Sequence, residues 1–252
     1  MTEQQLVDRL RAAGCVFAED EARVLLSSAS SANALEAMTA RRVAGEPLEY
    51  VVGWAEFCGL RVGVAPGVFI PRARTEFLVE VAVRLTPPGA QVVDLCCGSG
   101  ALGLAVAAAV PGIQLVAGDI DPAAVACARA NGVDARLGDL FAALPGGLRG
   151  HVDVLLANTP YVPTGELEFM PREARLHEAP VTLDGGADGL DLQRRVAAEA
   201  PRWLAAGGAV LVEASERQAP TTAAIFRAAG LTATLHHDEE RDATVVLGGL
   251  PQ

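Results

Sequence analysis

The stretch "QVVDLCCGSGALG", residues 91–103, decides the fold predicted for this chain. It begins as an apolar run typical of a buried strand, passes into a turn rich in glycine, and ends in residues that open a helix. Gly98, Gly100 and Gly103 follow one another with the spacing G-x-G-x-x-G. A strand, a glycine turn and a helix in this order are typical of an α/β sheet that holds a nucleotide-like ligand at the turn.

Strands and helices continue to alternate from this stretch to the end of the chain. Strands are expected over residues 91–95, 113–119, 134–139, 153–158, 208–214, 232–237 and 243–249, and helices over residues 75–85, 100–109, 122–130, 193–204 and 220–229. Such alternation predicts an α/β fold in which a parallel sheet carries helices on both faces. The last two strands follow each other without a helix, which predicts an antiparallel pair at the carboxyl end.

The part of the chain before the sheet has a different pattern. Apolar residues with helical spacing predict a small helical domain over residues 1–45, in which Asn33 and Glu36 are expected to form a capping box for the third helix. Short β-type runs interrupted by Gly and Pro predict a β-hairpin linker over residues 46–74. The main domain is then expected over residues 75–252.

Composition excludes several classes of protein. The net charge is −11, and all 20 basic residues are arginines, so the chain offers neither a basic surface for duplex nucleic acid nor a lysine for a Walker loop or a Schiff base. No apolar run reaches the roughly 18 residues of a membrane span, and the polar first residues have no apolar core of the kind that a signal peptide carries, so neither a membrane span nor a signal peptide is expected. The five cysteines include no CxxC pair, so we expect no metal site and a cytoplasmic location.

Acidic residues around the glycine turn narrow the choice of ligand. Asp119 ends the next strand, about 20 residues beyond the turn, where a carboxylate can accept hydrogen bonds from ribose hydroxyls. The glycines alone fit a plain tight turn, a nicotinamide-dependent oxidoreductase or a methyltransferase that uses S-adenosylmethionine. Asp94 and the small pair Cys96 and Cys97 favour the methyltransferase. Asp139 is expected either to reach the amino group of adenine or to cap a helix.

Polar residues follow the strand expected over residues 153–158. The Asn158 side-chain oxygen and the Thr159 backbone carbonyl can accept the N–H groups of a planar nitrogen and so localise its lone pair for attack on a methyl group. Tyr161 is expected to stack on that plane, and Pro160 to fix the direction of the carbonyl. The alternative is a structural turn. Glu213, at the end of a later strand, is expected to line the cleft or to meet solvent.

Six segments together resemble one known family. They are "RRVAGEPLEYVVGWAEF", "VFIPRARTEFLVE", "VVDLCCGSGALGLAVA", "LLANTPYVP", "EARLHEAPVTLDGGADGLD" and "RDATVVLGG". Their order is similar to that in the PrmC/HemK family of protein glutamine methyltransferases, which modify the Gly-Gly-Gln loop of peptide-chain release factors. The resemblance implies a Rossmann-like methyltransferase fold with a mixed seven-stranded sheet, S-adenosylmethionine as donor, and the side-chain amide of a protein glutamine as acceptor.

The resemblance also extends the set of candidate site residues. The "IPRARTE" segment resembles the part that closes over the cofactor in this family. The residues expected to bind the cofactor are therefore Arg72, Thr75, Glu76, Asp94, Cys96, Cys97, Gly98, Ser99, Gly100, Asp119, Ile120, Asp139, Leu140 and Asn158. The residues expected to act on the acceptor are Asn158, Thr159, Pro160 and Tyr161.

The chain departs from the family at several points. Thr159 replaces the first proline of the usual Asn-Pro-Pro-Tyr, Cys96 and Cys97 replace a common Gly and Thr, and Leu140 replaces an aromatic residue. The helical amino-terminal region is also shorter than the family's. The same four-residue motif also serves exocyclic amines, so one alternative is a methyltransferase that acts on a small-molecule or nucleobase amine, and the more distant alternative is an NAD-dependent oxidoreductase.

Overall fold

The structure, a computed structural model, describes residues 1–250 with the exception of the Arg172 side chain. Its main body is built on strands β3 (Gln91–Leu95), β4 (Gln114–Asp119), β5 (Ala135–Leu137), β6 (Val152–Ala157), β7 (Leu204–Ala214), β8 (Thr234–Asp238) and β9 (Ala243–Gly249). They form one seven-stranded sheet in the order β5-β4-β3-β6-β7-β9-β8. Only β9 runs against its neighbours, so the predicted mixed sheet with an antiparallel carboxyl-terminal pair is confirmed.

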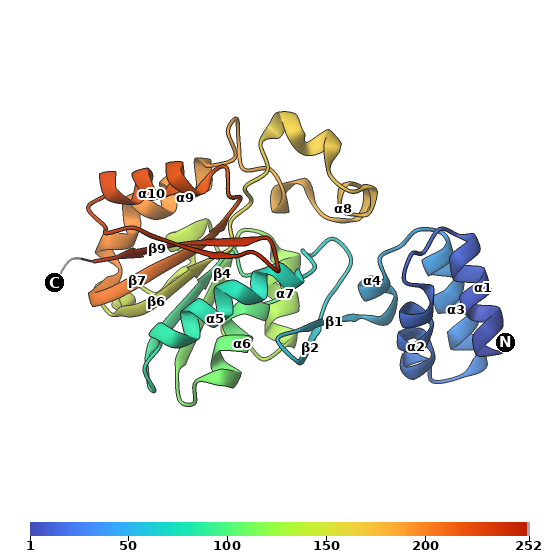
Figure 1. Cartoon of the computed structure of the whole chain (residues 1–252). Helices are drawn as coiled ribbons and strands as arrows, with labels where there is room; N and C mark the ends of the chain where they lie inside the picture. The colour runs from blue at the N-terminus through green and yellow to red at the C-terminus, as the bar shows by residue number, and fades with distance from the viewer. Residues whose placement is uncertain (251–252) are drawn as a thin grey trace.

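Helices cover both faces of this sheet (Figure 1). The helices of the main body are α5 (Glu76–Leu85), α6 (Ala101–Ala109), α7 (Pro122–Ala130), α9 (Asp191–Glu199) and α10 (Ala219–Ala228). Helices α5 and α6 pack on one face against Val92, Leu156 and Leu211, whereas α9 and α10 pack on the other. Because side chains alternate between the faces of a strand and helices cover both faces here, most residues of β3, β6 and β7 are buried and apolar, and these strands form the centre of the core.

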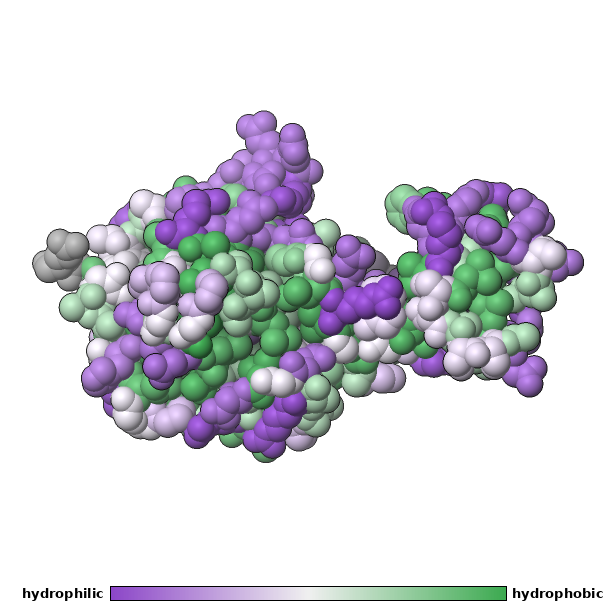
Figure 2. All heavy atoms as spheres, turned by 90° about the horizontal axis from the view of Figure 1, so that it is seen from below, coloured by the Kyte–Doolittle hydropathy of each residue, from purple (hydrophilic) through white to green (hydrophobic). Residues whose placement is uncertain are grey.

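The amino-terminal residues form a separate helical lobe. It contains α1 (Glu3–Ala12), α2 (Ala18–Ser28), α3 (Ala32–Val43) and α4 (Leu48–Val52). A hairpin of β1 (Trp54–Phe57) and β2 (Leu60–Gly63) follows it and leads to the main body (Figure 1). Figure 2 shows the two lobes joined by a narrow neck. The domain limits at residues 45 and 74 stay a prediction. Within residues 1–250, no helix is both long and apolar enough to cross a membrane.

Three local predictions were wrong. The capping box lies at α1, between Thr2 and Gln5, while α3 is capped by the Ser31 hydroxyl and not by Asn33. Residues 48–52 form helix α4 rather than a β-type run. Helix α9 ends at Glu199, earlier than expected, because a proline two residues further on cannot continue the hydrogen-bond ladder.

An irregular insertion between β6 and α9 had no predicted structure. It contains the short helix α8 (Arg172–His177), which is preceded and followed by 3-10 turns (Thr164–Phe169 and Pro180–Thr182). Short turns of this kind have no amphipathic period that a sequence pattern could reveal. The insertion lies at the same edge of the sheet as the glycine turn and forms part of the cleft described below.

Candidate active site

The register of three strands creates the site. In the parallel ladders, Leu95 of β3 lies beside Gly118 of β4 on one side and Ala157 of β6 on the other. The chain therefore leaves the sheet at the same edge after each strand. Since β3 is where the strand order reverses direction, this edge is the topological switch point at which open α/β sheets bind ligands. Asp119 and Asn158, at two of these strand ends, face the same cleft.

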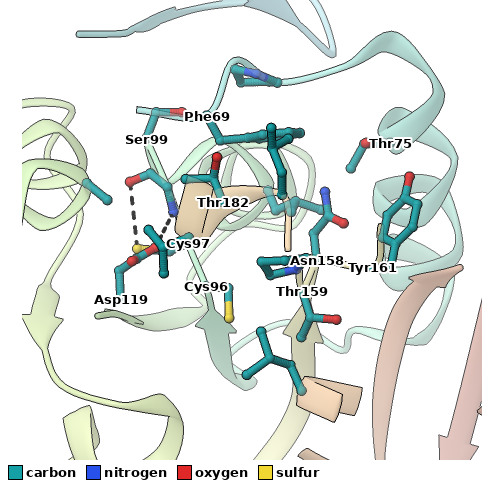
Figure 3. A pocket seen from close by; sticks show the side chains of 18 of the residues that line it. Phe69, Thr75, Cys96, Cys97, Ser99, Asp119, Asn158, Thr159, Tyr161 and Thr182 are labelled. Carbon is teal, nitrogen blue, oxygen red and sulfur yellow. Dashed lines mark hydrogen bonds between the residues drawn. The ribbon is translucent and has the colours of Figure 1, made fainter. Parts of the chain in front are cut away.

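Most of the predicted site residues line this cleft (Figure 3). The predicted residues in its wall are Arg72, Thr75, Cys96, Cys97, Gly98, Ser99, Asp119, Ile120, Asp139, Leu140, Asn158, Thr159, Pro160 and Tyr161. Glu76, Asp94 and Gly100 do not belong to the wall. The structure thus brings the two predicted sets together in one cavity, and the role of each residue stays a prediction.

Asp94 supports the glycine turn from inside the protein. Its side chain is fully buried, and its Oδ2 atom accepts a hydrogen bond from the Gly103 N–H at 3.0 Å. Burial raises the pKa of Asp94 to about 7. Gly100 has a similar structural place, because a Cβ atom there would lie 2.9 Å from Val133. Both residues hold the start of α6 in position behind the cleft.

Asp119 connects the glycine turn to the second strand of the site. Its Oδ2 atom accepts the Gly98 N–H at 2.9 Å, and its Oδ1 atom accepts the Asp121 N–H at 2.9 Å. Burial raises the pKa of this carboxyl group. Each carboxylate oxygen can accept more than one hydrogen bond, so Asp119 can hold the turn and still accept hydroxyl groups in the cleft.

The two cysteines form a neutral wall beside this carboxylate. Cys96 has φ +55°, a left-handed conformation that costs a residue with a side chain about 1 kcal/mol or more. Cys97 is buried and packs against Val125 and Ala128 of α7. Burial raises the pKa of both thiols, so they remain protonated at neutral pH. Neither thiol is activated as a nucleophile.

The far end of the cleft is mostly apolar. Ile120 is 53% exposed, and Leu140 is buried in a left-handed conformation with φ +48°. Asp139 makes no capping hydrogen bond, so the predicted cap is wrong. Its Oδ2 atom instead lies 2.7 Å from the Arg195 guanidinium of α9. This end therefore combines apolar side chains with one partly exposed ion pair.

The segment before α5 forms the opposite wall. Arg72 pairs with the buried Glu178, and its guanidinium lies 5.3 Å from the centre of the Phe69 ring. The Thr75 hydroxyl is buried and has no hydrogen-bond partner in the described part of the chain. Glu76 is not one of the lining residues, and its Oε1 atom accepts the Cys58 N–H of the hairpin turn at 2.8 Å.

The Asn-Thr-Pro-Tyr segment closes the cleft on the side of β6. Thr159 is only 1% exposed, and its hydroxyl has no partner within residues 1–250. The Tyr161 hydroxyl donates a hydrogen bond to Glu213 Oε1 at 2.7 Å and accepts one from Arg74 Nη2 at 2.5 Å. Burial and the neighbouring Glu213 carboxylate raise the pKa of Tyr161. Glu213 neither lines the cleft nor meets solvent, so both of its predicted places were wrong.

The glycine-rich loop before α9 packs against the backbone of the Asn-Thr-Pro-Tyr segment. Gly189 has φ +79°, and a Cβ atom there would lie 2.2 Å from the Tyr161 carbonyl oxygen. Gln218 Nε2 donates to the same carbonyl at 2.9 Å. Arg74, Gly189 and Gln218 were not predicted to take part in the site. The "DGGADGLD" run was a visible signal for a tight loop, but its partner could not be known from the sequence.

Known proteins are similar to this chain in sequence and in fold. The methyltransferase small domain family matches residues 60–189. The release factor glutamine methyltransferase of Geobacter sulfurreducens is 39% identical over 222 residues, which cover 86% of this chain and 77% of that protein. The 4-amino-L-phenylalanine/4-methylamino-L-phenylalanine methyltransferase of Streptomyces pristinaespiralis is 38% identical over 201 residues, 75% of this chain and 68% of that protein. A methyltransferase structure from Pyrococcus furiosus has the same fold, with a TM-score of 0.57 at 15% identity over 76% of this chain and 89% of that one.

The fold, the cleft at its switch point and the matching domain define a methyltransferase. Within that class, the chain belongs to the family of the release factor glutamine methyltransferases. The predicted Rossmann-like fold, enzyme class and family resemblance are confirmed. The NAD-dependent oxidoreductase is thereby set aside.

Proposed function

We propose that this protein transfers a methyl group from S-adenosylmethionine to the side-chain amide nitrogen of a glutamine in a peptide-chain release factor. The observation that carries the proposal is the position of Asn158, which ends β6 in the same cleft as Asp119 and the glycine turn. A carboxamide there can meet the acceptor nitrogen next to the donor. The similarity to release factor glutamine methyltransferases, 32–41% identical, supports the choice of acceptor.

The wall of the cleft fits the proposed donor. Asp119 offers a carboxylate to ribose hydroxyls, and Ile120 and Leu140 offer an apolar surface to adenine. Gly98 has no side chain at the point where a Cβ atom would face Phe69, 3.9 Å away, which leaves room beside the turn. The buried Thr75 hydroxyl is free to bond a polar group in the cleft. When bound, S-adenosylmethionine supplies an electrophilic methyl group on a sulfonium.

The residues of this chain prepare the nitrogen for attack. In the proposed reaction the Asn158 side-chain oxygen and the Thr159 carbonyl accept the two N–H groups of the amide, which localises the nitrogen lone pair and directs it toward the methyl group. Pro160 restrains the backbone that presents the carbonyl. The amide loses a proton only after the transfer, so no general base is needed before it.

Calorimetry tests the donor. S-adenosylmethionine is expected to bind and NAD is not. Asp119→Ala should weaken binding by about 1–3 kcal/mol, because it removes charged hydrogen bonds to the ribose. Asp134→Ala is a suitable control, since Asp134 is exposed and pairs with Arg136 away from the cleft. Unchanged affinity in Asp119→Ala would refute this placement of the ribose.

Mass spectrometry tests the acceptor. A release factor incubated with the protein and a methyl-labelled donor should gain one labelled methyl group on the glutamine of its Gly-Gly-Gln loop. Asn158→Ala should lower the rate by about 100-fold or more while donor affinity is preserved, as expected when one preorganised polar contact is lost. Methylation of the same loop after its glutamine is replaced would contradict the proposed acceptor.

A second candidate is methylation of an aromatic amine. It is favoured by the relative from Streptomyces pristinaespiralis, which is named for two amino-substituted phenylalanines, and by Thr159 in place of the family's usual proline. An arylamine nitrogen is also planar, and its lone pair is delocalised into the ring. The same labelled-donor assay with 4-amino-L-phenylalanine separates the two candidates, because only one acceptor should incorporate label efficiently.

A further inference from the structure

The ring of Tyr161 is held by a buried carboxylate that lies outside the cleft. The Tyr161 hydroxyl donates to Glu213 Oε1 at 2.7 Å. Arg74 contacts both groups, with Nη2 2.5 Å from the phenol oxygen and Nε 3.2 Å from the same carboxylate oxygen. The Arg74 guanidinium also lies 5.7 Å from the centre of the Tyr161 ring. Three segments that are distant in sequence therefore meet at one aromatic side chain.

The environment of Glu213 is energetically unfavourable. Its side chain is 4% exposed, and its Oε2 atom has no hydrogen-bond partner among the described residues. A carboxylate with an unpaired buried oxygen destabilises a fold. Glu213 is not part of the cleft wall, so it cannot contact the methyl donor or the methyl acceptor directly. Tyr161 and Arg74, its two partners, do line the cleft. Its connection to the reaction therefore runs through those two side chains.

The backbone of Tyr161 is fixed independently of its ring. Gln218 Nε2 donates to the Tyr161 carbonyl at 2.9 Å and to the Asp188 carbonyl at 3.0 Å. The next residue, Val162, pairs with the chain at Leu183 through a backbone hydrogen bond of 3.2 Å. Loss of the carboxylate contact should consequently free the ring while the loop that carries Asn158 stays in place.

We propose that Glu213 is a positioning residue for Tyr161. Together with Arg74 it forms a clamp, which fixes the ring of Tyr161 as a rigid wall of the acceptor site. A ring that is already immobile loses no rotamer freedom when a planar acceptor stacks on it, and it holds the acceptor plane in one orientation toward Asn158. The inference rests on the proposed function, because it takes the acceptor to be a planar nitrogen compound.

Tyrosine NMR tests the clamp without any acceptor. The chain has two tyrosines, Tyr50 and Tyr161, so a sample with ring-labelled tyrosine gives two sets of signals that a Tyr50→Phe variant assigns. Glu213→Met keeps the length of the side chain but offers no oxygen to the Tyr161 hydroxyl, so it should shift the Tyr161 signals and average its ring positions by faster flipping. Glu178→Met is the matched control, since Glu178 is also a buried glutamate paired with an arginine of the same cleft, Arg72, and should leave the Tyr161 signals in place. Unchanged Tyr161 signals in Glu213→Met would overturn the inference.

Kinetics then test whether Glu213 acts through the tyrosine. With a release factor as acceptor, Glu213→Met should lower kcat about tenfold and leave donor affinity unchanged. In a Tyr161→Phe background the same substitution should lower kcat less than about twofold. An equal loss in both backgrounds would show that Glu213 does not act through Tyr161 and would overturn the inference. If the native protein methylates no release factor, the proposed function fails, while the NMR result still decides the clamp.

Discussion

Thr159 has two groups that can meet an acceptor, its backbone carbonyl and its side-chain hydroxyl. It is predicted to act through the carbonyl, although the buried hydroxyl has no hydrogen-bond partner among the described residues. Its amide N–H makes no backbone hydrogen bond among the described residues. Proline at this position would therefore remove no donor that the fold uses, and proline would restrain the carbonyl further. The threonine departs from the family's motif without changing the groups expected to meet the acceptor.

Two substitutions of Thr159 test this role. Thr159→Pro and Thr159→Ala should each keep a substantial part of the methylation rate, because both preserve the carbonyl. The measurement is the rate of label transfer to a release factor, with bound donor measured separately by calorimetry. Asn158→Ala is the matched comparison, since it changes the adjacent residue and should lose about 100-fold. Loss of methylation in both Thr159 variants, with folding and donor binding intact, would implicate the hydroxyl and point to another acceptor.

Two loops hold the elements of the site in place, one before α9 and one between β1 and β2. The glycine-rich loop before α9 packs its backbone directly on the backbone of the Asn-Thr-Pro-Tyr segment, through Gly185 beside Pro160 and Gly189 beside Tyr161. The hairpin turn between β1 and β2 is joined to the start of α5 by Glu76. These contacts explain the placement of residues that do not themselves touch the cleft.

Gly189→Ala should damage both stability and activity. The new Cβ atom would lie 2.2 Å from the Tyr161 carbonyl oxygen, and the φ of +79° is strained for any residue with a side chain. We expect the free energy of unfolding to fall by about 1–3 kcal/mol, with a clear loss of methylation. Gly165→Ala, in the same insertion but in open space, should change neither quantity. Equal midpoints in urea for the two variants would contradict this packing.

Cys58→Asn should stabilise the hairpin. Cys58 and Gly59 both have positive φ, +50° and +73°, as in the type I′ turn that prefers Asn-Gly. Asparagine tolerates this conformation better than cysteine, so the free energy of unfolding should rise by about 0.5–1 kcal/mol. Glu76→Ala removes the acceptor of the Cys58 N–H and should have the opposite sign. A lower unfolding midpoint for Cys58→Asn would show that the thiol's packing outweighs its backbone strain.

The molecule as a whole contains buried carboxyl groups near its site. Burial raises the pKa of Asp94, to about 7, and also those of Asp119 and Glu178. The folded state therefore binds protons more tightly than the unfolded state does at these positions. The stability from this protonation is complete below the unfolded pKa of about 4 and is lost as the pH rises through the folded pKa values.

Asp94→Asn should reduce this pH dependence. In the native protein, the free energy of unfolding is expected to fall as the pH is raised from about 5 to about 8. Asparagine cannot ionise, and its oxygen can still accept the Gly103 N–H, so the slope should become flatter. Urea unfolding at several pH values gives the slopes. Asp134→Asn, at an exposed position, should leave the native slope, and an unchanged slope in Asp94→Asn would show that Asp94 does not titrate there.

The order of the strands and helices of the main body, and the edge at which the ligand site lies, could be predicted from local sequence patterns. Apolar runs, glycine turns and helix periods are local signals, and α7 and β9 have the residues that these signals predicted. A parallel sheet places the residues after its strands at one edge, so Asp119 and Asn158 could be assigned to one cleft before their contacts were known.

Which side chains contact each other across the site depends on the packing of the folded chain and could not be predicted from sequence patterns. Arg74 and Tyr161 are 87 residues apart, and Tyr161 and Glu213 are 52 residues apart. Such partners share no spacing that a pattern could reveal, because their approach depends on the packing of whole elements. For the same reason the contact between Glu76 and the hairpin turn at Cys58, 18 residues earlier, was not predicted. Position along a strand follows from local chemistry, whereas the direction of a long side chain follows from the neighbour that the fold brings to it.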